Sequence, residues 1–156
     1  MSKKFKVYDR PFVTKADRNN CIIVDMDGTL ALMDGRSPYD DKRSNQDMPN
    51  SPVVAHVNGM AIAYPNLHII IVSGRHEHAR EATIEFLNDY NISFDDLFMR
   101  RDDDYRGDDL IKKEIYNNNI APYYNVLYIV DDRSRVVKMW RKELGLTVFQ
   151  VDEGDF

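Results

Sequence analysis

The sequence of 156 residues lacks the features that mark several large classes of protein. It contains one cysteine, Cys21, which excludes an internal disulfide and a multi-cysteine metal cluster. Its longest aliphatic segment, residues 69–72, is far shorter than the roughly 20 apolar residues of a membrane helix. It has no internal repeat and no Gly-Lys pair, which excludes solenoid arrays and the phosphate loop of P-loop kinases. We therefore expect one cytoplasmic globular domain without a membrane partner.

Basic residues are scarce outside the N-terminal segment. Residues 1–18 carry six Lys or Arg and two Asp, so 15 basic and 24 acidic side chains remain in a chain of net charge -5. Because affinity for long nucleic acid depends on many Lys and Arg contacts to phosphates, this acidic body argues against a large duplex footprint. It does not argue against binding one terminal phosphate. The basic N-terminal segment, residues 1–20, is either a polyanion contact or a solvated tail.

Apolar segments and helical patterns alternate along the rest of the chain. Four short β-rich segments predict buried strands, at residues 21–24, 68–72, 126–130 and 147–151. Apolar side chains at helical spacing predict four helices, which begin with Ser51 as cap, near residue 77, near residue 108, and at Ser134 with Gly145 as C-cap. This alternation predicts an α/β domain, in which a mostly parallel sheet carries helices on both faces. Ligands of such sheets bind beyond the carboxyl ends of the strands.

Residues 30–50 interrupt the alternation. They are rich in Asp, Arg, Ser, Pro and Asn, and loops of this length inside a compact domain are usually functional. We therefore predict a small flap over the carboxyl ends of the strands. Tyr39, in this flap, is placed either to stack on a nucleobase or to pack within the flap.

Two carboxylates follow the first apolar segment. Asp25 and Asp27 are separated by one residue and followed by Gly28 and Thr29. A hydrophobic strand followed by Asp-x-Asp-Gly-Thr is the signature of the haloacid dehalogenase superfamily, which this chain resembles. The resemblance implies a Rossmann-like fold with a minimal cap, in which Asp25 is the nucleophile and Asp27 the general acid and base. A carboxylate nucleophile needs a nearby cation to reduce its repulsion from phosphate.

Three more elements of the superfamily pattern follow in order. Ser73 ends the second apolar segment, where the family holds a phosphoryl oxygen. Lys112, near the start of the third helix, is the candidate for the family lysine, with Lys113 as a rival. Asp131 and Asp132 follow the third apolar segment, where the family binds magnesium.

The resemblance implies a Mg²⁺ site of four carboxylates. Its members would be Asp25, Asp27, Asp131 and Asp132. Carboxylate oxygens are hard ligands of the kind that this ion prefers. The four histidines, in contrast, lack the spacing of convergent zinc ligands, so we expect them at the surface or at the rim of the site.

A closer resemblance covers the chain from about residue 20 to its end. Residues 25–36, 72–75, 106–112, 131–133 and 136–141 resemble the phosphatase half of phage polynucleotide kinase/3′-phosphatases, whereas the kinase half is missing. By this resemblance Arg36 and Arg75 bind the substrate phosphate, and Arg100 and Asp108 are further members of the site. Guanidinium groups bind phosphate bidentately and stay charged, which suits this role.

The resemblance implies a phosphatase domain over residues 21–156. It would hydrolyse 3′-phosphate ends of DNA or RNA through an aspartyl-phosphate, with Mg²⁺ as cofactor. A nucleotidase or small-metabolite phosphatase would share this chemistry and differ only in the substrate. A non-catalytic interaction domain is the alternative of another class, and the retained catalytic side chains argue against it. The sequence leaves open whether the chain forms a homodimer.

Overall fold

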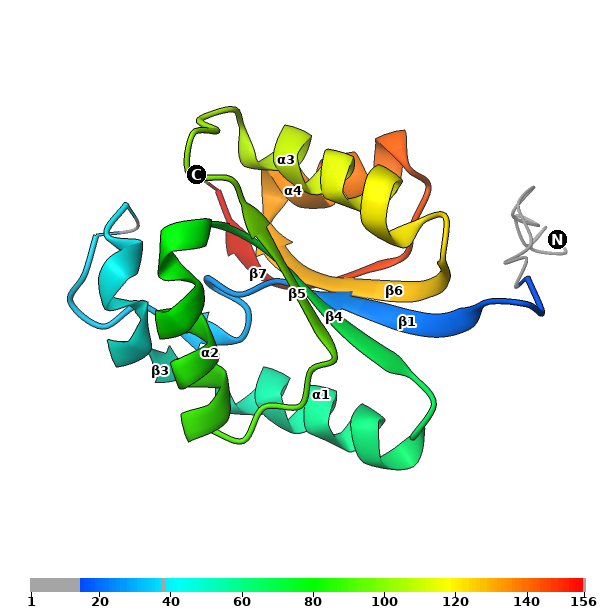
Figure 1. Cartoon of the computed structure of the whole chain (residues 1–156), viewed down its shortest axis with the longest axis horizontal. Helices are drawn as coiled ribbons and strands as arrows, with labels where there is room; N and C mark the ends of the chain where they lie inside the picture. The colour runs from blue at the N-terminus through cyan, green and yellow to red at the C-terminus, as the bar shows by residue number, and fades with distance from the viewer. Residues whose placement is uncertain (1–14, 38, 156) are drawn as a thin grey trace, which may run out of the picture.

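The computed structural model describes residues 15–37 and 39–155, and a five-stranded parallel sheet forms its centre (Figure 1). The strand order is β5-β4-β1-β6-β7, and each neighbouring pair is parallel. The strands are β1 Asn19–Val24, β4 His68–His76, β5 Asp96–Arg100, β6 Tyr124–Arg133 and β7 Val148–Gly154. The predicted α/β fold is confirmed. Residues 1–14 of the basic N-terminal segment, Pro38 and Phe156 lie outside the described residues.

Helices cover both faces of the sheet, as predicted. One face carries α1 (Ser51–Ala63) and α2 (Arg80–Asp89), and the other carries α3 (Asp108–Ile115) and α4 (Ser134–Lys138) (Figure 1). A 3-10 turn, η2 (Glu77–Ala79), leads into α2. Both α3 and α4 continue as single π-helical turns, η3 (Tyr116–Ile120) and η4 (Met139–Glu143).

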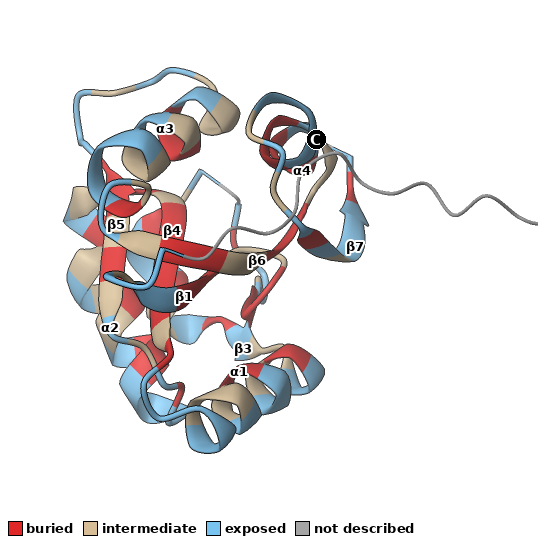
Figure 2. Ribbon diagram, turned by 90° about the vertical axis from the view of Figure 1, so that its right-hand side faces the viewer, coloured by how far each residue is buried: buried red, intermediate tan, exposed pale blue. Residues whose placement is uncertain are grey.

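The alternation of side chains along the strands divides the core into two layers. In β1, Ile22 and Val24 pack under α1 and α2, whereas Cys21 and Ile23 pack under α3 and α4. Successive strand residues point to opposite faces, and much of the central strands is buried (Figure 2), so the buried part of β1 is apolar toward both faces. Cys21 is fully buried in this core, and burial raises the pKa of its thiol to about 12.

Three details of the predicted elements were wrong. The N-cap of α1 is Asn50, not Ser51, because the Asn50 carbonyl accepts hydrogen bonds from the first helical amides, and Ser51 is already helical. Edge strand β5 was missed, since its short alternation of buried Leu97 and Met99 with half-buried Phe98 is framed by charged residues. The C-cap of η4 is Leu144, and Gly145, which was predicted as the cap, is the next residue, where its φ of 68° ends the helix.

The flap is an excursion between β1 and α1. Its ends pair as two short antiparallel strands, β2 (Ala31–Leu32) and β3 (Met48–Pro49), and the 3-10 helix η1 (Asp41–Gln46) lies between them. This helix packs against α2 beside the carboxyl ends of the strands (Figure 1). The sequence placed this excursion correctly, and the fold sets it next to the predicted site.

Among the described residues, no helix combines the length and the apolar character that crossing a membrane would require.

Candidate active site

Asp25 lies where β1 ends and is held by two side chains. Lys112 Nζ donates to Asp25 Oδ1 at 2.6 Å, and Thr29 Oγ1 donates to Asp25 Oδ2 at 3.1 Å. Burial raises the pKa of the Asp25 carboxyl well above its usual range, and the positive charge of Lys112 opposes this rise. The rival Lys113 points to Glu143, with 3.5 Å between Nζ and Oε1. The fold therefore brings Lys112 to the predicted nucleophile.

Lys112 is fully buried and surrounded by carboxylates. Besides Asp25 it contacts Asp131 at 3.1 Å and Asp108 at 3.7 Å, measured from Nζ to the nearest Oδ atom. Burial alone would lower the pKa of this amine, but the three carboxylates outweigh burial and raise it well above its usual range. The structure thus fixes a permanent positive charge beside Asp25.

Three carboxylates converge beside this lysine. One oxygen from each of Asp25, Asp131 and Asp132 lies within 4.8 Å of the others, and all three residues are buried. Burial raises the pKa of the Asp132 carboxyl, and the negative charge of Asp131 raises it further. Because buried carboxylates at this separation repel one another, the donor set fits a divalent cation, whose charge would offset the repulsion. Among the described residues no histidine belongs to such a group.

Close packing around this cluster depends on glycine and tryptophan. Gly28 has a φ of 82°, and a Cβ at this position would clash with the Asp132 carboxylate. Trp140 Nε1 donates to Asp131 Oδ2 at 3.1 Å. The sequence alone does not reveal this contact, because an indole that packs in a core and one that also orients a carboxylate have the same helical spacing.

Asp27, which was predicted as a fourth metal ligand, does not belong to the group of converging carboxylates and pairs with two arginines instead. Its carboxylate accepts hydrogen bonds from Arg36 Nη2 at 2.9 Å and from Arg75 Nη2 at 2.7 Å. Burial opposes the charge on Asp27, but Arg75 and Arg36 outweigh burial and lower its pKa. The carboxylate stays partly open, with 31 % of its side chain exposed.

A second carboxylate, Asp47 of the flap, holds the same two arginines. Asp47 accepts hydrogen bonds from Arg36 Nε at 2.7 Å and from Arg75 Nη2 at 2.8 Å, and its side chain is 1 % exposed. The side chains of both arginines are also almost fully buried. Sequence analysis missed Asp47, since nothing in the pattern separates it from the other acidic residues of the flap. Through its contact with Arg75, Asp47 joins the flap to β4.

The carboxyl-terminal part of β4 approaches the site through Ser73 and Gly74. Ser73 is buried, and its Oγ accepts a hydrogen bond from the Arg75 amide at 3.2 Å. A Cβ at Gly74 would clash with the Asp108 carboxylate, so the absence of a side chain lets α3 come this close. Ser73, near the carboxyl end of β4, and Asp25, directly after β1, thus lie on neighbouring parallel strands at the edge where the sequence predicted the site.

Arg100, predicted to contact substrate, bonds to the protein itself. Its Nε donates to the Gly74 carbonyl at 2.8 Å, and its Nη1 donates to the carbonyls of Asp104 and Arg106 at 3.1 and 2.6 Å. Its Nη2 lies 3.4 Å from Asp108 Oδ1. Arg100 therefore ties the loop between β5 and α3 to the segment that carries Ser73.

Residues 19–156 match the family model described as the polynucleotide kinase PNKP phosphatase domain. The chain belongs to this family. It is 38% identical over 132 residues to a protein of Autographa californica nuclear polyhedrosis virus that bears the name of a bifunctional polynucleotide kinase/RNA ligase, and the match covers 83% of this chain and 19% of the relative. The resemblance to haloacid dehalogenase phosphatases and to polynucleotide kinase/phosphatases is thereby confirmed.

Solved structures agree with this assignment. A chain in the Pnkp1/Rnl/Hen1 RNA repair complex superposes with a TM-score of 0.87 at 42% identity, over 92% of this chain and 46% of that one. Another Pnkp1/Rnl/Hen1 structure gives a TM-score of 0.87 at 43% identity, over 91% of this chain and 49% of that one. A class C acid phosphatase from Bacillus anthracis, with tungstate bound, shares only the fold, at 14% identity and a TM-score of 0.50 over 75% of this chain. The chain spans less than a fifth of the viral relative and less than half of each matched chain in the two Pnkp1/Rnl/Hen1 structures.

Proposed function

We propose that this phosphatase domain hydrolyses 3′-phosphomonoester ends of DNA or RNA through an aspartyl-phosphate on Asp25. The observation that carries the proposal is the 2.6 Å contact between Asp25 and buried Lys112, beside two further carboxylates. This arrangement provides a nucleophile with a fixed positive charge next to it. Membership of the polynucleotide kinase phosphatase family supports nucleic-acid ends as the substrate.

The first step transfers the phosphoryl group to Asp25. An Oδ atom of Asp25 attacks phosphorus, the bond between phosphorus and the 3′ oxygen breaks, and the departing alkoxide takes a proton from Asp27. Lys112, Ser73 and nearby amides provide hydrogen bonds to the phosphoryl oxygens. In the second step a water molecule gives a proton to Asp27 and attacks the aspartyl-phosphate, which releases inorganic phosphate and restores Asp25.

Arg36 and Arg75 hold Asp27 in position for both steps. In the structure they keep Asp27 ionised, which is the form that a general base needs. The general-acid step needs the protonated form, and an approaching phosphate dianion favours that form because like charges raise the pKa of a carboxyl group. The partly open side chain of Asp27 allows this proton to come from solvent.

Mg²⁺ is the divalent cation that we propose for Asp25, Asp131 and Asp132. When bound, it would supply the positive charge that offsets the repulsion between these carboxylates and the substrate phosphate. We assign catalysis to residues 21–156, with Asp108 and Arg100 supporting the phosphate-holding segment.

A substrate panel tests the proposal. Wild type and Asp25→Asn are compared on oligonucleotides with a 3′- or a 5′-phosphate and on mononucleotides, with release of inorganic phosphate as the readout. We expect hydrolysis of the 3′-phosphates, at most weak activity on the 5′-phosphates, and no turnover by Asp25→Asn, whose amide cannot form the acyl phosphate. Much faster hydrolysis of mononucleotide 5′-phosphates would make the chain a nucleotidase instead.

A further inference from the structure

Three flat rings lie side by side at the carboxyl end of β4. The ring centroids of His76 and His78 are 5.4 Å apart with an interplanar angle of 3°, so the two imidazoles are stacked. The Tyr105 ring packs on His76 with a centroid distance of 5.5 Å. None of these side chains has a part in the two chemical steps above. Together they form what we call the aromatic rim, His76, His78 and Tyr105.

The two imidazoles of the rim are fixed in place. His78 Nε2 lies 2.6 Å from Asp41 Oδ1 in the flap, and His78 Nδ1 lies 3.0 Å from Asp102 Oδ1 in the loop after β5. The His76 amide donates to the other oxygen of Asp41 at 3.0 Å. The stacked pair is therefore held between the flap and the loop.

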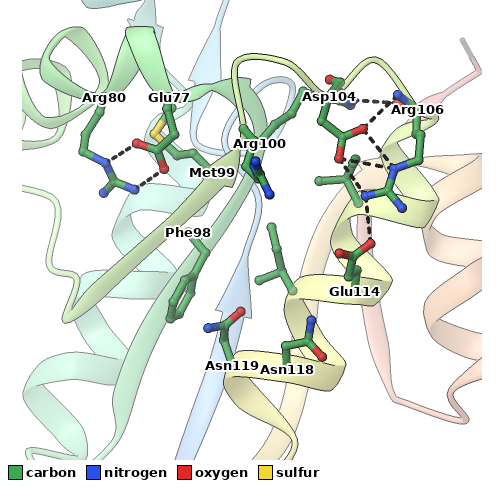
Figure 3. A pocket seen from close by; sticks show the side chains of 13 residues that line it. Glu77, Arg80, Phe98, Met99, Arg100, Asp104, Arg106, Glu114, Asn118 and Asn119 are labelled. Atoms are coloured by element: carbon green, nitrogen blue, oxygen red, sulfur yellow. Dashed lines mark hydrogen bonds and ion pairs between the residues drawn. The ribbon is translucent and has the colours of Figure 1, made fainter.

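Tyr105 is exposed although its loop is strongly anchored. The residue is 84 % exposed, yet Arg100 Nη1 binds the carbonyls of both its neighbours, Asp104 and Arg106. Arg106 in turn pairs with Asp104 at 2.6 Å and with Glu114 at 2.8 Å, as Figure 3 shows. The anchored backbone holds a large ring in solvent, where that ring adds little to the stability of the fold.

Arg100, which anchors this loop, also contacts the segment of β4 that carries Ser73. Arg100 Nε donates to the Gly74 carbonyl, and Gly74 lies between Ser73 and Arg75. His76, against which the Tyr105 ring packs, follows Arg75 directly in the sequence. The aromatic rim is thus attached to the residues that hold the phosphate, at the edge of the sheet where ligands bind.

A pocket that Asp104 and Arg106 of the same loop help to line is a weaker candidate for a ligand site. Five of its seven charged side chains pair among themselves, Arg80 with Glu77 and Arg106 with Asp104 and Glu114 (Figure 3). Exposed Tyr105, in contrast, makes no ring contact among the described residues other than the tilted one with His76, so most of its ring is open to solvent.

We propose that Tyr105, backed by His76 and His78, is the stacking platform for the base of the substrate's 3′-terminal nucleotide. The inference rests on the proposed function. Stacking on an aromatic ring contributes binding energy with every base and needs no positive charge, which suits a domain with an acidic body. The platform would give this phosphatase a preference for nucleic-acid ends over small phosphate esters, without a preference for sequence.

The test compares two oligonucleotides that differ in one base. Both are single-stranded and carry a 3′-phosphate, but in one the terminal nucleotide is abasic. We expect wild type to prefer the intact oligonucleotide, and Tyr105→Ala to lower kcat/KM on it by about 5- to 100-fold, mainly through KM. On the abasic substrate Tyr105→Ala should match wild type. Tyr105→Phe should retain the preference, because it keeps the ring.

The matched control is Tyr123→Ala. Tyr123 is also exposed, but it precedes β6 at the amino end of the strands, so this variant should keep the base preference. An equal loss by Tyr105→Ala on both substrates would show a structural role of the loop and overturn the platform. So would unchanged kinetics on the intact oligonucleotide. In both cases wild type still hydrolyses 3′-phosphates, whereas failure of the proposed function would leave wild type inactive on both.

Discussion

The substitution Asp47→Asn tests whether the flap is part of the catalytic structure. Asp47 is the buried carboxylate that binds Arg36 and Arg75 through contacts of 2.7 and 2.8 Å. An asparagine has the same shape but no charge, and its amide N–H groups would face guanidinium N–H groups. Two buried arginines would then share the single charge of Asp27, which is partly exposed.

We expect this change to lower the free energy of unfolding by about 3–5 kcal/mol, since removing one partner from a buried charge pair leaves the charge of the other partner uncompensated. With an m-value of about 2 kcal/mol per molar urea, the unfolding midpoint should fall by roughly 1.5 to 2.5 M. The kcat for a 3′-phosphorylated oligonucleotide should fall as well, because Asp27 loses the geometry that its two arginines impose. Urea unfolding followed by circular dichroism, and kcat measured far below the unfolding midpoint, separate the two effects.

Asp40→Asn is the matched control within the same flap. Asp40 pairs with Arg43 at 2.7 Å, but both side chains are well exposed. We therefore expect Asp40→Asn to lower the free energy of unfolding by at most about 1 kcal/mol and to leave kcat unchanged. The reasoning is refuted if Asp47→Asn unfolds at the same urea concentration as Asp40→Asn, or if it is destabilised but fully active when folded.

Three further outcomes follow from the geometry. Asp27→Asn should slow hydrolysis by about 10²- to 10⁴-fold for an alkyl phosphate and less for an aryl phosphate, whose leaving group needs no proton; equal losses on the two would contradict its acid role. Gly28→Ala should destabilise the fold and abolish activity because of its positive φ, whereas Gly59→Ala, in open space on α1, should stabilise it by about 0.5–1 kcal/mol in urea unfolding. Because Asp41 raises the pKa of His78, the stability that His78 contributes is present at acidic pH and is lost as pH rises through the raised pKa, so wild type and His78→Gln should converge in thermal unfolding at alkaline pH.

The chemistry of the site could be predicted because it lies in contiguous segments. An apolar strand that ends in Asp25 and Asp27 carries its signature in a few adjacent residues, and the same holds for Ser73 and for Asp131 with Asp132. Their meeting at one edge follows from the parallel order of the strands, which the alternation of strands and helices already implied. To choose Lys112 over Lys113, one must know which side of α3 faces the site. The two neighbouring lysines leave the helix in different directions, Lys112 toward Asp25 and Lys113 toward Glu143.

The tertiary structure decided what the polar side chains do once they meet. From the sequence, Arg36 and Arg75 were expected to bind phosphate and Arg100 to be a further member of the site, since a guanidinium group suits a phosphate as well as it suits a carboxylate. The fold places Asp47 and Asp27 around the first two and backbone carbonyls around the third. Such contacts join residues that are distant in the chain, so short-range sequence patterns cannot predict them. The sequence by itself thus determined the fold class and which carboxylates meet in the acidic cluster. The support for Asp27 and the aromatic rim depend on how the flap and the loop after β5 pack against β4.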